Sequence, residues 1–170
     1  LWGSPVYDWE ALRASRYAWW VERFRQNFRL CDVLRIDHFR GLVACWEIPA
    51  GAKTAVEGRW VKVPTEDLFE VLTGSFESFP VVAEDLGVIT DDVREAMERL
   101  GLPGMKVLLF AFGGDAAENP YLPHNHVPGC VVYPGTHDNN TVRGWFESEA
   151  TEKEKARLLK YLGREVDAKD

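Results

Sequence analysis

Apolar residues recur along the chain in two alternating patterns, one typical of helices and one typical of buried strands. Helical spacing runs over residues 7–29, where Asp8 is placed to cap the first turn. Short apolar runs predict strands at residues 33–36, 81–83, 106–112 and 131–133. Further helices are predicted where a polar or acidic start precedes an apolar run that a glycine closes, at residues 65–74, 90–101 and 151–163. The last of these opens with a capping box formed by Thr151 and Glu154.

Residues 48–64 carry prolines, glycines and mixed charge without a regular period, and we expect a long loop there. Elsewhere, strands that alternate with helices predict parallel βα units, which fit both a doubly wound sheet and a barrel. Acidic residues follow three of the four predicted strands, namely Asp37, Glu84 and Asp138. Side chains that converge from several strand ends favour a TIM barrel.

A complete (β/α)8 barrel needs about 250 residues, and this chain has 170. We therefore expect an α/β fold in which residues 1–170 are a partial catalytic barrel domain, truncated at both ends. It would carry about four consecutive βα units, roughly strands 4 to 7. The start at Leu1, without a methionine and directly before a recognisable motif, agrees with a piece cut from a longer enzyme.

Composition narrows the function classes. A net charge of −7 argues against nucleic-acid binding, because phosphate backbones are repelled. No run of 18 apolar residues and no basic leader with an apolar core occurs, so neither a membrane span nor a secretion signal is expected. The three cysteines, Cys31, Cys45 and Cys130, form no CxxC pair and indicate reduced thiols in a cytoplasmic compartment.

The three strand-end carboxylates suit the cleavage of a glycosidic bond with retention. One ionised carboxylate attacks the anomeric carbon, and a protonated carboxyl first gives a proton and later takes one. A third can bind the hydroxyls of the distorted ring. The residues alone leave a second interpretation open, in which these carboxylates are helix caps or salt-bridge partners.

A metal site is the other chemistry that these residues suggest. The chain has four histidines, and His137 and His38 each lie beside an acid. They lack metal-site spacing such as HExxH. We therefore expect neither a metal nor a cofactor.

Three strings, RIDHFRG (residues 35–41), AEDLG (83–87) and GTHDNN (135–140), resemble signature regions of the α-amylase superfamily of barrels. The segments LWGSPVYDW, WEIPAG, TAVEGRWVK, GLPGMKVLLFAF and ENPYLPHNH narrow the match. Together they resemble the amylomaltase or 4-α-glucanotransferase family, glycoside hydrolase family 77, from Leu1 to about Phe146.

The resemblance implies a role for individual residues. Asp37 matches the nucleophile, Glu84 the general acid/base and Asp138 the transition-state stabiliser. Arg35 would orient the nucleophile, and His38 and His137 match contacts to sugar hydroxyls. Trp2 is similar to an aromatic residue that lines the glucan groove. Trp46 and Trp60 could do the same, with core or loop packing as the alternative.

The activity implied is transfer of a 1,4-α-glucan segment from a donor to an acceptor sugar by double displacement. An α-amylase-like hydrolase and a non-catalytic glucan-binding half-barrel are the alternatives. The cytoplasm is the expected location, and a plastid is also compatible with the sequence. The chain alone is expected to be inactive and to self-associate through open edge strands.

Overall fold

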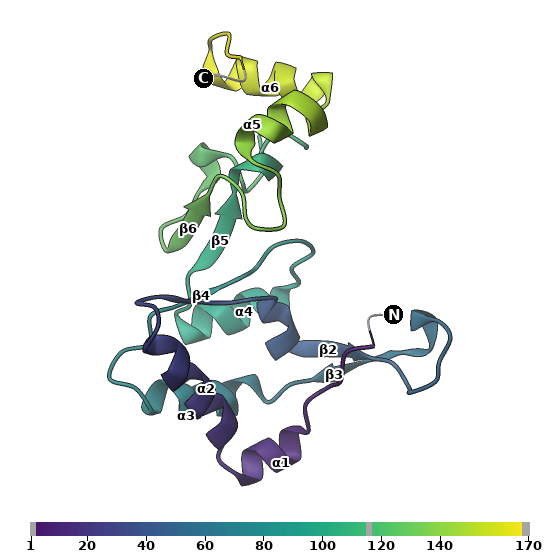
Figure 1. Ribbon diagram of the computed structural model, residues 1–170, viewed down its shortest axis with the longest axis vertical. Coiled ribbons are helices and arrows are strands. Elements are labelled where there is room, and N and C mark those ends of the chain that lie inside the picture. The colour runs from purple at the N-terminus through teal and green to yellow at the C-terminus, as the bar shows by residue number, and fades with distance from the viewer. Residues whose placement is uncertain (1–2, 115–116, 168–170) are drawn as a thin grey trace. The chain divides into compact units, whose positions relative to one another are not determined.

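The computed structural model describes residues 3–114 and 117–167 of the protein. The chain divides into two compact units, Leu1–Gly104 and Met105–Asp170, which are drawn together in Figure 1. In chain order, the helices and strands of the first unit are α1 (Trp9–Ala14), α2 (Ala18–Phe28), β1 (Leu34–Ile36), β2 (Ala44–Glu47), β3 (Arg59–Lys62), α3 (Thr65–Gly74), β4 (Val81–Ala83) and α4 (Asp91–Leu100).

Strands β1 and β4 pair in parallel, with Leu34 opposite Val81 and Ile36 opposite Ala83. The N–H of Ala83 donates to the carbonyl of Pro103 at 2.8 Å, just before strand β5 (Gly104–Val107) begins. Parallel strands that are joined through helices are βα units, so the α/β class with parallel strands is confirmed. The described strands form two-stranded sheets and do not close into a barrel.

The core of the first unit lies where α2 and α3 pack around β1 and β4. Residues with no exposed surface include Phe39, Leu68, Phe69 and Leu72. Helix α3 supplies the last three, at positions that share one face of a helix. Ala83, at the end of β4, is fully buried as well. The residues that follow β4 are therefore anchored to the packed core.

The single helix predicted over residues 7–29 is interrupted in its middle. Arg16 and Tyr17 adopt left-handed φ angles of 51° and 53°, which end α1 and start α2. The turn puts Tyr17 into the core with 1% of its surface exposed. Its hydroxyl donates to Asp67 Oδ2 on α3 at 2.5 Å. Tertiary packing, which helical spacing does not reveal, accounts for the break.

The expected loop over residues 48–64 is wrong in its second half. Strand β3 pairs antiparallel with β2 and forms a hairpin, with Trp46 directly opposite Trp60. Both ends of one predicted strand also differ from those in the structure. The strand predicted for residues 106–112 is β5, which ends at Val107 and turns into a 3-10 helix at Leu108–Phe110.

The second unit contains β5 paired with β6 (Cys130–Tyr133), followed by the single turn α5 (Val142–Gly144) and helix α6 (Glu152–Leu162). A π-helical turn, Trp145–Glu149, lies between α5 and α6, and the spacing of apolar residues does not predict it. The capping box of Thr151 and Glu154 is present, and Gly163 ends α6 with a φ of 67°. Within the described ranges, no helix is long and apolar enough to cross a bilayer.

The contact between Tyr17 and Asp67 generates a stability prediction. Asp67 also accepts from Arg13 Nε at 2.7 Å, and these two hydrogen bonds, that of Tyr17 first, lower the pKa of Asp67 from its ordinary 3.8. A carboxyl whose pKa is lowered on folding stabilises the fold above its unfolded pKa and loses that effect as pH falls through the folded value.

We therefore expect Tyr17→Phe to lower the melting temperature by a few degrees at pH 7, because one charge-assisted hydrogen bond is lost. The difference from wild type should shrink as the pH is brought below 3.8. Tyr7→Phe is the matched control, since Tyr7 is 41% exposed. Thermal denaturation at both pH values checks this, and an equal melting temperature for Tyr17→Phe and wild type at pH 7 would contradict it.

Candidate active site

The carboxylate of Asp37 lies directly after the last residue of β1. Arg35 precedes it by two residues, and alternation in an extended strand points both side chains to the same face. Arg35 Nη2 lies 2.8 Å from Asp37 Oδ1, with side-chain exposures of 26% and 72%. A partly buried cation therefore fixes the direction of an open carboxylate through a charge-assisted contact.

Glu84 occupies the equivalent position directly after β4. Both of its carboxylate oxygens accept backbone N–H groups: Oε2 from His38 and Oε1 from Leu86, each at 2.7 Å. The main chain, rather than a neighbouring side chain, thus sets the direction of this carboxyl group. Such donors are rigid because their positions follow from the backbone itself.

The two strand ends are also joined through main-chain bonds. The N–H of Glu84 donates to the carbonyl of Ile36 at 2.9 Å, and the N–H of Phe39 donates to the carbonyl of Glu84 at 3.1 Å. His38, between them, has a φ of 48° in the left-handed region. A non-glycine residue rarely adopts that conformation, and strained backbone of this kind is frequent at active sites. Here it turns the N–H of His38 toward Glu84.

Asp85, next to Glu84, packs against a neighbouring strand. A Cβ added to Gly104 would lie 2.6 Å from Asp85 Oδ2, so this carboxyl packs against the start of β5. Only a residue without a side chain leaves room for it. The carboxyl group of Asp85 therefore packs within the fold, whereas that of Glu84 lies against the N–H groups of His38 and Leu86.

His137 and Asp138 lie in a loop of the second unit, after β6. Asn139 Oδ1 accepts from the N–H and the hydroxyl of Thr136, at 2.9 and 3.1 Å, and the N–H of Asp138 donates to Thr136 Oγ1 at 3.3 Å. The loop is therefore held by its own side chains. His137 Nε2 lies 3.4 Å from Asp138 Oδ2, and both side chains are open, with exposures of 70% and 75%.

The structure thus brings Arg35, Asp37, His38 and Glu84 together at neighbouring strand ends, and His137 with Asp138 in the second unit. Trp2 lies outside the described residues. Among the residues that the structure does describe, no group of three or more His, Cys, Asp or Glu side chains could hold a metal ion.

Sequence reasoning missed two donors to Glu84 in the first unit and one side chain that orders the Asp138 loop in the second unit. The N–H groups of His38 and Leu86 bind Glu84, but a backbone donor leaves no signal in residue type. Asn139 organises the Asp138 loop. The run Thr136–His137–Asp138–Asn139 does contain the signal for it, because Asn side chains commonly bond to nearby main chain in turns.

Comparison with known proteins shows the family to which the chain is similar. A family model described as 4-alpha-glucanotransferase matches residues 1–170. The 4-alpha-glucanotransferase of Clostridium butyricum is 49% identical over 162 residues, 95% of this chain and 33% of that protein. The chloroplastic/amyloplastic 4-alpha-glucanotransferase DPE1 of Arabidopsis thaliana is 51% identical over 162 residues, 95% of this chain and 28% of that protein.

A solved structure, the amylomaltase from Streptococcus agalactiae in complex with acarbose, superposes with a TM-score of 0.88 at 36% identity. It covers 97% of this chain, which corresponds to 33% of that protein. The chain therefore spans about a third of the length of the relatives it matches. From its first residue to its last, the chain belongs to the 4-alpha-glucanotransferase family.

Proposed function

We propose that the full-length protein is a retaining 4-α-glucanotransferase, which moves a 1,4-α-glucan segment from a donor to the 4-hydroxyl of an acceptor sugar. The observation that carries the proposal is the pair of carboxylates at adjacent parallel strand ends. One is aimed by the guanidinium of Arg35, and the other is held by the N–H groups of His38 and Leu86. The family supports the substrate class, because its named members are glucanotransferases.

In this mechanism Asp37 attacks the anomeric carbon while Glu84 gives its proton to the departing glycosidic oxygen. The bond from C1 to that oxygen breaks as the bond from C1 to Asp37 forms. An acceptor sugar then attacks C1, and Glu84 takes the proton from its hydroxyl, which restores both carboxyl groups. Two consecutive inversions give retention.

The hydrogen bonds of Glu84 give this cycle a structural requirement. Both carboxylate oxygens accept N–H groups in the structure, and each keeps a second lone pair that can hold a proton. When Glu84 is protonated, its hydroxyl oxygen accepts less well than a carboxylate oxygen does. The oxygen that bears the proton therefore keeps a weaker bond to its N–H donor, and its hydroxyl directs the proton away from that N–H toward the leaving oxygen.

The chain supplies part of the catalytic barrel in this proposal. Residues 1–170 would be about four βα units, roughly strands 4 to 7 of a (β/α)8 barrel, with the carboxylates at the carboxyl ends of the strands where barrel active sites form. Asp138 would bind hydroxyls of the distorted ring. His38 and His137 would contact further hydroxyls. The cytoplasm or, as in the plant relative, a plastid would be the place of action.

Replacement of Asp37 by Asn in the full-length enzyme should abolish transfer, because no covalent glycosyl intermediate can form. Wild type should convert maltotriose into glucose and a ladder of longer maltodextrins, separated by chromatography. Asp32→Asn, the same change five residues earlier in the chain, is the control and should stay active. Transfer above a few per cent of wild type in Asp37→Asn would rule out its role, and maltose plus glucose without longer products would indicate a hydrolase.

Replacement of Glu84 by Gln should stop turnover of maltodextrins, because no proton reaches the leaving oxygen. An activated donor with a good leaving group needs no such proton, so Glu84→Gln should still release that group in a burst. Stopped-flow absorbance with a nitrophenyl maltoside measures it. If both kinds of donor fail equally while the melting temperature matches wild type, Glu84 is not the acid/base.

Asp138→Asn should lower kcat by at least about a hundredfold and change KM much less, because a contact that strengthens only in the transition state affects turnover rather than ground-state binding. Asn139→Ala in the same loop is a useful comparison, since it removes the acceptor for Thr136 and so tests loop geometry while the charge of Asp138 is kept. Steady-state kinetics on maltotriose separate the two. A rise in KM with unchanged kcat would make Asp138 an ordinary binding residue.

A further inference from the structure

Two tryptophans are presented side by side on the β2–β3 hairpin. Trp46 and Trp60 are directly opposite each other across the strands, so they share one face. Their ring centroids are 5.5 Å apart at 69°, and their exposures are 41% and 53%. We infer that this pair, which we call the hairpin platform, binds an α-1,4-glucan chain beyond the sugars held at the catalytic carboxylates. The inference rests on the proposed function for its ligand class.

The rings of the platform are held in fixed orientations. Trp46 Nε1 donates to the carbonyl of Ala55 at 2.8 Å, within the loop that joins the two strands. A Cβ on Gly58 would lie 2.2 Å from the same nitrogen, so the indole fills the space that a side chain would take. Trp60 is stacked by Arg40, whose Cζ lies 4.6 Å from the ring centroid. Rings that are already ordered lose little entropy when a ligand binds.

Arg40 connects the platform to the loops that carry the catalytic carboxylates. It follows Asp37 by three residues in the turn after β1. Its Nη1 donates to the carbonyl of Val88 at 2.9 Å and to Thr90 Oγ1 at 3.3 Å, in the loop that follows Glu84. The platform therefore lies beside the loops that carry Asp37 and Glu84. A glucan chain that extends past the sugars held at these carboxylates would pass over it.

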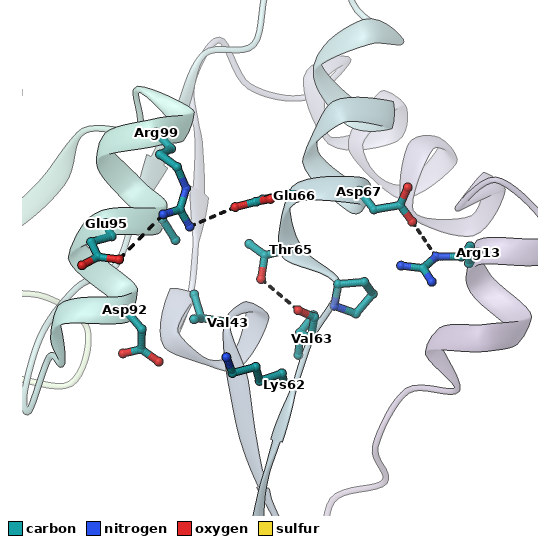
Figure 2. Close-up of a pocket in the computed structure, with 12 residues that line it drawn as sticks. Arg13, Val43, Lys62, Val63, Thr65, Glu66, Asp67, Asp92, Glu95 and Arg99 are labelled. Carbon is teal, nitrogen blue, oxygen red and sulfur yellow. Dashed lines mark hydrogen bonds and ion pairs between the residues drawn. The ribbon is translucent and has the colours of Figure 1, made fainter.

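The same face of the hairpin leads into a polar groove. Lys62, two residues after Trp60 on β3, projects on the same side and lines a groove of about 420 Å³ between the hairpin base, α3 and α4. Figure 2 shows the charged side chains around this groove, with Asp92, Glu95 and Arg99 from α4 and Glu66 and Asp67 from α3.

The hairpin platform and the polar groove match the two kinds of surface that a sugar chain presents. The C–H faces of glucose units pack on aromatic rings, and their hydroxyls need donors and acceptors. Side chains of both charges line the groove, which suits a neutral polyhydroxyl ligand better than an anionic polymer. A glucan is therefore the occupant that the chemistry favours over nucleic acid or an acidic peptide.

The test compares long and short substrates in the full-length enzyme. Trp60→Ala should lower the ratio of kcat/KM for maltoheptaose to kcat/KM for maltotriose by about tenfold, which corresponds to about 1.4 kcal/mol of binding to the longer chain. Trp60→Phe keeps an aromatic face and should recover most of the ratio. Arg59→Ala is the control on the opposite face of the hairpin, opposite Glu47, and should leave the ratio unchanged.

Two results would overturn the inference. One is a ratio within twofold of wild type in Trp60→Ala. The other is a lowered melting temperature in both Trp60 variants without a change in the ratio, which would show that the pair packs against another part of the enzyme.

Calorimetric titration of maltoheptaose into Asp37→Asn, with and without Trp60→Ala, separates this inference from the proposed function. Weaker binding in the double variant supports the platform even if the wild-type enzyme turns out not to transfer. Equal binding in both overturns it.

Discussion

The parallel pairing of β1 with β4 is the constraint on which the site depends. Three residues of ladder place Ile36 beside Ala83, so the next residues, Asp37 and Glu84, emerge together at one edge. The bond from the N–H of Glu84 to the carbonyl of Ile36 extends the ladder by one step beyond the strands. A shift of one strand by one residue would turn the carboxyl group of that strand to the opposite face and separate the pair, because side chains alternate along a strand.

The buried base of these strands explains why such short segments can hold a site. Ala83 has no exposed surface, and Phe39 and Leu72 pack in the same core. Interiors packed at crystal density resist displacement, so the strand ends move little relative to each other. The exposed carboxylates then need only local partners, and Arg35 and the N–H groups of His38 and Leu86 provide them.

Much of this arrangement could be predicted from residue patterns. Asp37 and Glu84 were placed at strand ends because short apolar runs precede them, and the helix at 65–74 has the predicted bounds because an acidic first turn and a closing glycine mark it. The predictions fail where tertiary contacts, rather than local sequence patterns, determine the backbone conformation. Tyr17 interrupts a helical pattern and packs in the core, and the left-handed φ of His38 has no counterpart in the spacing of apolar residues.

The strand Arg59–Lys62 could not be predicted because of the composition of the residues around it. Glycines, prolines and charges in residues 48–64 match a loop, and only the partner strand Ala44–Glu47 makes Trp60 part of a sheet. Gly58 is the residue on which this hairpin depends, because the indole of Trp46 occupies the place of its missing side chain. Positions 46 and 58 are therefore coupled sterically, and a Cβ at position 58 would also lie 2.9 Å from the carbonyl oxygen of Glu47. A smaller residue at position 46 would remove the contact with the indole and leave the one with the carbonyl, so the main chain of the hairpin itself also favours glycine at position 58.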